Sequence, residues 1–475
     1  MKGKVIISLI CIATILLSLC IPASANSRPQ YWEGTDASGL VVREGDIPIV
    51  VESELLTFDL PTLPYARYTD VESFLAYDSK VTAEYTFYNP TDMTITATLL
   101  FPFGTFPDYG RTNAELELGK HGVYINGEKI EANLRHTNMF SYYDFDASAH
   151  LATLSDEFVE DEFYTKNLTV TKYSYEIVGH KLSSAFFNIK VDQVGTERCI
   201  VLHNGNIGGY ITDSGAFSMS SYPSKNETVT VHFYVFGEPL TDSPDVGWYK
   251  HNGASPATAI DGEFRYLGSE STTLNDFIFR EYNEYAGISE IDWYNACIAR
   301  MKDLEECSFS KNTRAISHLY LGGTMRWFEY QVTFQPGEKI KNTVVAPMYP
   351  NINAEKNPYE YGYTYLLSPA AGWADFGNLD IVINTPYEMS MSNLEGFEKT
   401  ETGYKLSSEG LPKDGEKYED LHFTLLNDGN TPKYQPGSSN FSGNGAIKKS
   451  IGSFFTNIFQ SIGRFIRSII DALFG

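Results

Sequence analysis

VTAEYTFYNPTDMTITATLLFPFG, residues 81–104, is the stretch of this sequence that decides the fold. Apolar and polar side chains alternate from Val81 to Tyr88, and the alternation resumes from Met93 to Phe101. A two-residue period places one set of side chains on a buried face of a sheet and the other set toward water. The NPTD segment at residues 89–92 supplies turn-forming residues between the two arms. The stretch therefore predicts two strands paired as a β-hairpin.

The same alternation recurs along much of the chain outside residues 81–104. Asn126-Gly127 lies between short β-prone arms and is typical of a type I′ turn, which predicts a hairpin over residues 122–134. A QPGE turn at residues 335–338 predicts a hairpin-like unit between the strands on either side of it. Strands are expected at residues 47–60, 168–177, 184–191, 228–236, 327–334, 341–346, 361–367, 379–384 and 421–426. Many short strands separated by turns favour a mainly β fold with sandwich-like domains.

Helical periodicity replaces the β pattern after residue 268. Apolar residues recur at three- and four-residue spacing over residues 289–306, and Ser289 with Asp292 forms a helix start signal. A further helix is expected at residues 272–285. We therefore expect two β-sandwich-like domains with a helical insertion between them, followed by a C-terminal amphipathic helix. The expected boundaries are 26–267 for the N-terminal domain, 268–319 for the helical segment and 320–426 for the C-terminal domain.

An acidic insertion interrupts the N-terminal domain at residues 136–166. Its carboxylates alternate with aromatic residues in what the pattern predicts to be a helical or irregular segment; they are Asp144, Asp146, Asp156, Glu157, Glu160, Asp161 and Glu162. The segment offers oxygen ligands for calcium, but it lacks the glycine and the ligand spacing of an EF-hand loop. The preferred interpretation is a solvated acidic segment that binds no metal.

The N-terminus has the pattern of a secretory signal peptide over residues 1–25. Lys2 and Lys4 precede an apolar run, and Ala23-Ser24-Ala25 forms a cleavage site. The expected localisation is extracytoplasmic, with the protein either secreted or peripherally attached to the outer face of the cell membrane.

Three cysteines remain after removal of this leader, namely Cys199, Cys297 and Cys307. Three are too few for a disulfide framework in an exported protein, so the hydrophobic core must supply the stability. We expect these residues to be buried or unpaired thiols.

The C-terminal end carries the second distinctive pattern. Residues 427–446 are rich in Gly, Ser, Asn and Pro, which is typical of a flexible linker. Residues 447–475 place apolar side chains on one stripe of a helical wheel, and two arginines near the middle argue against a spanning helix. The pattern favours a helix lying in a membrane interface, while docking on the protein's own body and self-association are the alternatives. The residues expected to contact the membrane are Ile451, Phe454, Phe455, Ile458, Phe459, Ile462, Arg464, Phe465, Ile466, Arg467, Ile469 and Ile470.

Composition and motifs restrict the possible chemistry. A formal net charge of −24 disfavours nucleic acid as a partner, because phosphates require clustered Lys and Arg. The sequence has no H-E-x-x-H, G-x-S-x-G, P-loop or C-x-x-C motif, so it indicates no catalytic residues and no cofactor. Its histidines lack ligand spacing, which disfavours zinc. The tryptophans could stack on sugar rings, but core packing is their expected role; they are Trp32, Trp248, Trp293, Trp327 and Trp373.

Five segments of the sequence carry a family resemblance. ESELLTFDL at residues 52–60, the Tyr-x-Phe-x-Asn strand in VTAEYTFYNPTD at residues 81–92 and the strand ending in Phe-Pro in TATLLFPFG at residues 96–104 form one pattern. It is similar to the motifs of a family of secreted bacterial proteins, catalogued only as a domain of unknown function. RWFEYQVTFQPGEK at residues 326–339 and YTYLLSPAAGW at residues 363–373 resemble the second half of that family. The resemblance implies an extracytoplasmic β-rich fold over most of residues 26–425. It implies no catalytic residues, and the amphipathic tail lies outside it.

Together these patterns predict an exported, surface-tethered β-sandwich protein of interaction or scaffolding type. Its expected partners are a membrane surface, through the C-terminal helix, and a protein or glycan of unspecified identity. The alternative is an extracellular glycan-binding module or a glycan-active enzyme. A cleft with two close carboxylates, one of raised pKa, would favour the enzyme, whereas an exposed aromatic platform would favour sugar binding.

Overall fold

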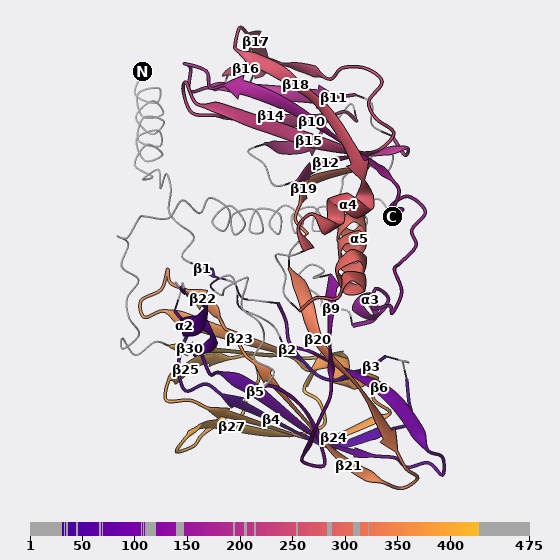
Figure 1. The fold of residues 1–475 in the computed structure, drawn as a ribbon. Coiled ribbons are helices and arrows are strands. Elements are labelled where there is room, and N and C mark those ends of the chain that lie inside the picture. The colour runs from indigo at the N-terminus through magenta and orange to yellow at the C-terminus, as the bar shows by residue number, and fades with distance from the viewer. Residues whose placement is uncertain are drawn as a thin grey trace, which may run out of the picture.

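The computed structural model describes residues 31–426 apart from short gaps at 33, 35–36, 44–45, 66–67, 69, 106, 108, 110–119, 139–146, 193–194, 204–206, 213–214, 253–254, 283–286, 307–313 and 322. The predicted signal peptide, linker and amphipathic helix, with all of its membrane-binding residues, lie outside the described residues. Within them the protein is mainly β, as the sequence predicts (Figure 1).

One part of the structure, here called the frame, consists of three main sheets. Sheet C runs in the order β26 (Glu398–Lys399), β27 (Gly403–Glu409), β24 (Asp375–Asn384), β4 (Val50–Asp59), β5 (Lys80–Tyr88), β21 (Lys339–Pro347), β7 (Gly122–Ile125) and β8 (Glu128–Ile130). Sheet B runs β3 (Val41–Val42), β6 (Ile95–Pro102), β20 (Thr324–Phe334) and β9 (Asn133–Asn138). Sheet A runs β1 (Tyr31–Trp32), β22 (Asn351–Asn353), β23 (Glu360–Leu366), β30 (Leu421–Leu426) and β25 (Glu388–Ser392), with β2 (Ala37–Ser38) beside β23.

A continuous hydrophobic core joins the three sheets of the frame. Side chains from sheet C, such as Phe58 and Tyr85, pack in one cluster with Phe423 of sheet A and Phe328 of sheet B. The smaller elements of the frame are α2 (Val71–Leu75), the 3₁₀ helix η2 (Ser368–Gly372) and the ribbon formed by β28 (Lys413–Asp414) and β29 (Lys417–Tyr418). The side-chain period of two explains this packing, because each strand directs one face toward the shared core.

The prediction of a hairpin over residues 81–104 is wrong. Strands β5 and β6 form where the alternation predicts them, but β5 pairs with β4 and β21 in sheet C, whereas β6 pairs with β3 and β20 in sheet B. The turn between them is therefore an arch that carries the chain from one sheet to the other. The predicted hairpin-like unit around residues 335–338 is a second arch, because β20 belongs to sheet B and β21 to sheet C.

The two arches lie side by side and are joined at their turns. Asn89 is fully buried, and its side-chain Nδ2 donates to the carbonyl oxygens of Met93, Phe334 and Gln335 at 2.8, 3.2 and 3.2 Å. Its Oδ1 accepts from the backbone nitrogen of Thr91 at 3.0 Å. One side chain thus satisfies backbone groups of both turns. In a hairpin, such backbone groups would pair directly with those of the facing strand. By contrast, the predicted Asn126-Gly127 hairpin is confirmed, with both residues at positive φ between β7 and β8.

The second part, here called the inserted unit, enters the chain between β9 and β20 of the frame. Sheet D runs β18 (Phe264–Thr273), β10 (Thr169–Val178), β15 (Thr228–Gly237), β12 (Arg198–His203) and β19 (Arg314–Leu319). Sheet E runs β13 (Gly208–Ile211), β14 (Phe217–Ser221), β11 (Ala185–Val191), β16 (Asp245–Asn252) and β17 (Ser255–Ile260). Two helices, α4 (Leu274–Phe279) and α5 (Glu290–Glu306), complete the unit.

This arrangement corrects the predicted domain boundaries. Strands before and after the helical segment share sheets: β4 lies beside β24, and β6 lies beside β20. Residues 320–426 therefore do not form a sandwich of their own, and residues 26–267 do not form one either. Local patterns identified the strands, but they carried no information about which distant strands pair.

The inserted unit is layered. Sheets D and E pack face to face through a core that includes Phe233 of sheet D and Trp248 of sheet E. The opposite face of sheet D is covered by α4 and α5, with Phe236 of the sheet in one cluster with Phe277 and Trp293 of the helices. Figure 1 shows α5 between sheet D and the frame. Sheet E is therefore the layer farthest from α5, and its outer face is the one turned away from sheet D.

The helical segment matches the sequence at α5 and differs at α4. Helix α5 begins one residue after Ser289, whose side-chain oxygen accepts from the backbone nitrogen of Asp292 at 3.0 Å, as the start signal predicts. The predicted helix at residues 272–285 shortens to α4, because β18 continues to Thr273, which caps the helix instead. Cys199 and Cys297 are buried free thiols, as predicted, and Cys307 lies outside the described residues.

The acidic insertion is largely irregular where the structure describes it. Residues 136–138 belong to β9, and α3 (Ala147–Leu151) is the short helix after the gap at 139–146. From residue 152 the chain runs along α5, where Asp161 pairs with Lys302 at 2.9 Å. Asn295 of α5 accepts from the backbone nitrogen of Val159 at 2.8 Å. The segment is thus held to the helix and is not only a solvated acidic stretch.

Candidate functional site

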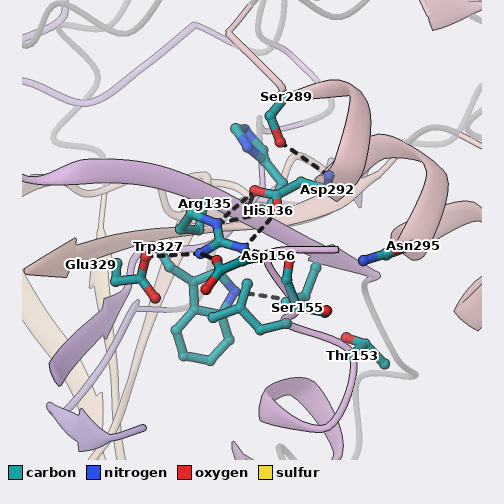
Figure 2. A network of polar contacts seen from close by, with 12 residues as sticks. Arg135, His136, Thr153, Ser155, Asp156, Ser289, Asp292, Asn295, Trp327 and Glu329 are labelled. Carbon is teal, nitrogen blue, oxygen red and sulfur yellow. Dashed lines mark hydrogen bonds and ion pairs between the residues drawn. The ribbon is translucent and has the colours of Figure 1, made fainter. Parts of the chain in front are cut away.

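A buried ionic network joins the frame to the inserted unit, and Figure 2 shows it from close by. Arg135 of β9 directs its guanidinium toward Asp292 of α5, with Nη2 donating to Oδ1 at 3.0 Å and Nε donating to Oδ2 at 3.1 Å. The Asp292 side chain is only 2% exposed. Its Oδ2 also accepts from the backbone nitrogen of His136 at 2.9 Å. The first turn of α5 is therefore fixed directly to a strand of the frame.

The remaining donors of Arg135 are also satisfied. Nη1 donates to Glu329 of β20 at 2.8 Å and to Asp156 at 2.9 Å, and Nη2 donates to the carbonyl oxygen of Ser155 at 2.9 Å. Arg43 reinforces the group by donating to Glu329 at 2.6 Å. Burial alone would lower the pKa of Arg135, but Asp292 and Glu329 together raise it above its usual value. We call Arg135, Asp292, Glu329, Asp156 and Arg43 the junction network. Because its charged side chains pair with one another, we assign it a structural role.

A second buried polar group lies inside the frame, where strands of sheets C and A meet. Glu54 of β4 lies opposite Tyr85 of β5 in sheet C, and Tyr365 of β23 in sheet A donates to its Oε1 at 3.5 Å. The hydroxyls of the two tyrosines are 3.4 Å apart. Burial raises the pKa of Glu54 to about 7, although hydrogen bonds with both tyrosines oppose the shift. The carboxyl is only 1% exposed, so a substrate cannot reach it.

The outer face of sheet E carries the most distinctive surface. A row of aromatic rings crosses three strands: Tyr222 follows β14, Phe186 is on β11, and Tyr249 lies directly opposite Phe186 on β16. Phe186 stacks on Tyr222 and Tyr249 with ring centroids 5.6 and 5.9 Å apart and interplanar angles of 30° and 27°. His251 stacks on Phe186 at 4.4 Å and 27°. We call these four residues the aromatic row.

The exposure of the aromatic row differs from that of core aromatics. Tyr222 is 62% exposed, His251 is exposed and Tyr249 is half-buried, whereas Phe186 is covered by the rings around it. The neighbouring residue Phe187 points the other way, into the core between sheets D and E. Two adjacent phenylalanines in a strand occupy opposite faces, so Phe186 faces away from the core that holds Phe187. The adjacent pair Phe186-Phe187 was the sequence signal for this aromatic surface, and the sequence analysis did not use it.

A row of small polar residues lies beside the aromatic row. Asn188, two positions along β11 from Phe186, is flanked by Ser220 on β14 and by Gly247 on β16, and Gly208 lies beyond Ser220 on β13. The Oδ1 of Asn188 accepts from the hydroxyls of Ser220 and Ser218 at 3.0 and 2.9 Å. A Cβ built on Gly208 would meet no atom within 4 Å. We call Gly208, Ser220, Asn188 and Gly247 the polar row, and it is open to solvent at Gly208.

Other predictions about functional residues have mixed outcomes. Trp248, Trp293, Trp327 and Trp373 are buried in cores, as expected, and the side chain of Trp32 is not described. In the part of the chain that the structure describes, no three His, Cys, Asp or Glu residues are grouped so that they could hold a metal ion. The described helices include none that is long and apolar enough to cross a membrane. The predicted membrane-binding residues, Ile451 to Ile470, stay a prediction.

Comparisons with known proteins add little to this geometry. No protein-family model matches the sequence, and no curated protein matches it either. Among solved structures, a "putative nutrient binding protein" from Legionella pneumophila aligns with 83% of this chain and 72% of its own. The two share 9% sequence identity and a TM-score of 0.34, a similarity too low to relate their folds or functions.

Proposed function

We propose that this protein is exported, is held at the outer face of the cell membrane by residues 447–475, and works by binding a partner without catalysis. The observation that carries the binding role is the aromatic row, because stacked rings with an exposed tyrosine lie on a sheet face that no other described element covers. Apolar side chains that remain accessible beside ordered polar groups are typical of recognition surfaces.

The rest of the fold supports this role by presenting that face rigidly. Sheet E packs on sheet D, sheet D packs on α5, and Asp292 of α5 is fixed to Arg135 of the frame. Binding surfaces built on packed strands hold their side chains more precisely than surfaces built on loops. The junction network therefore stabilises the orientation of the binding face relative to the frame.

The enzyme alternative receives less support. A glycan-active enzyme needs two carboxylates that reach the same substrate bond, one of them with a raised pKa. Glu54 has the raised pKa, but it is enclosed in the core and its polar neighbours are tyrosines. The buried carboxylates Asp292 and Glu329 are engaged by Arg135. None of these three carboxylates is placed to act on a bound glycan.

The tether is supported by the amphipathic pattern of residues 447–475 and can be tested by liposome flotation. We expect the mature full-length protein to float with vesicles that contain anionic lipid, whereas a chain ending at Asn440 should remain in solution. Replacing Phe454 and Ile458 with serine in the full-length protein should release it, and the conservative Thr456→Ser substitution should not. If both chain lengths stay in solution, or if both float, the tether is wrong.

The binding role is tested on the same mature protein with two sets of probes, a panel of soluble oligosaccharides and a displayed library of random peptides. We expect ligands to be captured by the wild-type protein and lost when Tyr222 and Tyr249 are replaced with alanine. Tyr65→Ala removes an exposed tyrosine from the frame and should change nothing. Ligands that bind equally well to all three proteins would show that recognition lies elsewhere.

A further inference from the structure

The geometry of sheet E points to a more specific ligand. We propose that its outer face binds a neutral glycan, with one pyranose ring stacked on the aromatic row and its hydroxyls hydrogen-bonded to the polar row. This inference rests on the proposed binding role and names the chemical class of the ligand. Its first support is the arrangement of the aromatic row: Tyr222, Tyr249 and His251 stack on Phe186 at interplanar angles of 27–30°. The exposed rings of Tyr222 and His251 lie within 9° of parallel to each other.

The exposed and nearly parallel rings of Tyr222 and His251 suit the apolar C–H face of a sugar. Aromatic rings offer large apolar area with a negative face, which attracts the polarised C–H groups of a pyranose. Tyr222 and His251 also lie close enough for a hydroxyl contact, with Oη and Nε2 3.4 Å apart. The platform therefore combines apolar area with polar edges, as a ligand with one apolar face and a rim of hydroxyls requires.

The polar row supplies donors at the correct distance from the rings. Phe186 and Asn188 are two residues apart on one strand, which separates the two rows by about 7 Å. Because Oδ1 of Asn188 accepts from Ser218 and Ser220, the amide NH₂ is left as a half-exposed donor. Gly208, beyond Ser220, presents no side chain on that side of the amide. On the other side, the ring of Tyr249 lies 3.6 Å from the position that a Cβ on Gly247 would take. A hydroxyl that accepts from this amide would belong to a sugar that also contacts the exposed rings of the aromatic row.

Charge around the two rows favours a neutral ligand. Lys190, the next residue along this face of β11, pairs with Asp192 at 2.8 Å, and Asp245 lies opposite it on β16. The hydrogen bond and charge of Asp192 raise the pKa of Lys190, so the lysine is engaged by carboxylates. An anionic ligand would meet these carboxylates and the negative charge of the whole protein.

A protein partner is less well matched to this face. Stable protein interfaces bury about 800 Å² on each partner around a central apolar cluster. Here the apolar side chains are a single row of rings and the separate Tyr210, and the polar row adjoins the rings directly. The aromatic row and the polar row together form a narrow strip, which suits a ligand about as wide as a sugar chain.

The test uses the mature full-length protein and short neutral gluco-, manno-, galacto- and xylo-oligosaccharides, with oligogalacturonate as the acidic comparison. We expect saturation transfer from the protein to the ring protons of at least one neutral oligosaccharide. Titration calorimetry then gives its affinity. Tyr249→Ala and Tyr222→Ala should each weaken binding about tenfold, because each removes one stacking contact. Tyr65→Ala should leave the affinity unchanged.

A second variant tests the polar row without disturbing the core. Gly208→Leu places a branched side chain where a Cβ meets no atom, so it should fold normally and block the approach to Asn188. We expect it to weaken glycan binding about tenfold or more. Gly372→Leu is the matched control, since a Cβ at Gly372 also meets no atom and the residue lies in the frame.

Each outcome decides between the two proposals. Neutral binding that the sheet E variants weaken supports the glycan ligand, whereas preference for the acidic oligosaccharide, or neutral binding that these variants leave intact, overturns it. If no oligosaccharide binds but library peptides bind and are lost in Tyr249→Ala, the glycan inference fails and the binding role stands. If neither kind of probe binds, both fail.

Discussion

The guanidinium of Arg135 and the carboxylate of Asp292 are joined by hydrogen bonds of 3.0–3.2 Å across the boundary between the frame and the inserted unit. The two residues are 157 positions apart in the sequence. Both side chains are largely withdrawn from water, at 11% and 2% exposure. A buried pair of this kind contributes less to net stability than its geometry suggests, but removing one partner leaves the buried charge of the other with fewer counter-charges.

Asp292→Asn should therefore destabilise the protein by about 1.5–3 kcal/mol, because Arg135 loses one charged partner and keeps Glu329 and Asp156. The amide keeps the shape of the carboxylate but removes its negative charge, so the loss reports the charge of Asp292 and not its packing. Urea unfolding followed by tryptophan fluorescence measures it. Glu270→Gln is the control, because Glu270 forms an exposed pair with Lys172 and its loss should cost less than about 1 kcal/mol. Equal effects of the two substitutions would contradict the assigned role of the junction network.

Sequence patterns predicted only part of the junction network. Ser289 and Asp292 were identified as a helix start, and the hydrogen bond between them confirms it. The partner of the Asp292 carboxylate could not be predicted, because Arg135 is one of many basic residues and its pairing depends on how a distant strand docks on the helix. The aromatic row was missed for a related reason: its rings come from three strands, and their neighbourhood exists only once the register of sheet E is set.

The arches show the same limit on a larger scale. The alternation at residues 81–88 and 95–101 is identical for a hairpin and for an arch, because both bury one side of each strand. What separates them is the pairing of β5 with β21, whose residues lie more than two hundred positions away. Asn89 was predicted as an ordinary turn residue, yet it is the connection between the two arches.

Asn89→Ala should destabilise the frame by about 2–4 kcal/mol. The substitution leaves buried carbonyl groups of Phe334 and Gln335 without the donor they have in the native protein. Thermal or urea unfolding measures the change, and Thr94→Ala serves as the control. Thr94 contacts Gln335 at the exposed edge of the same turn, so its loss should stay within about 0.5 kcal/mol. A neutral Asn89→Ala variant would mean that the arches hold together without this side chain.

The thiols of Cys199 and Cys297 should not react with an alkylating reagent in the native protein. Both are completely buried, and burial raises the pKa of each thiol above its usual value, so the reactive thiolate is rare and inaccessible. Peptide mass spectrometry after brief treatment with iodoacetamide should find both unmodified at neutral pH, and fully modified in urea. Ser269→Cys, at an exposed position of β18, provides a thiol that should react in the native state. Rapid native labelling of Cys199 or Cys297 would contradict the packing described for the inserted unit.

Glu54 should make the stability of the frame depend on pH. Burial raises its folded-state pKa to about 7, whereas an unfolded chain should have a value near 4.5. A raised pKa means that the folded state binds the proton more tightly, so the contribution to stability is full below about pH 4.5 and is lost as pH rises through 7. The difference corresponds to about 3 kcal/mol. Tyr85 and Tyr365, the polar groups that face the carboxyl, have pKa values raised well above the usual one and remain neutral in this range.

Urea unfolding of the wild-type protein and of Glu54→Gln between pH 4.5 and 8.5 tests this prediction. The glutamine variant cannot ionise, so the difference in unfolding free energy between the two proteins should shift by about 3 kcal/mol in its favour across that interval. Glu84→Gln is the control, because Glu84 lies on the next strand with its side chain outside the core, paired with Lys341. A shift of this size that occurs with Glu54→Gln and not with Glu84→Gln would assign it to the carboxyl in the core. If the difference for Glu54→Gln does not change with pH, the carboxyl is ionised in the core at every pH tested and the prediction is wrong. We do not expect this result, because an ionised carboxylate beside two neutral tyrosines is costly without a cation.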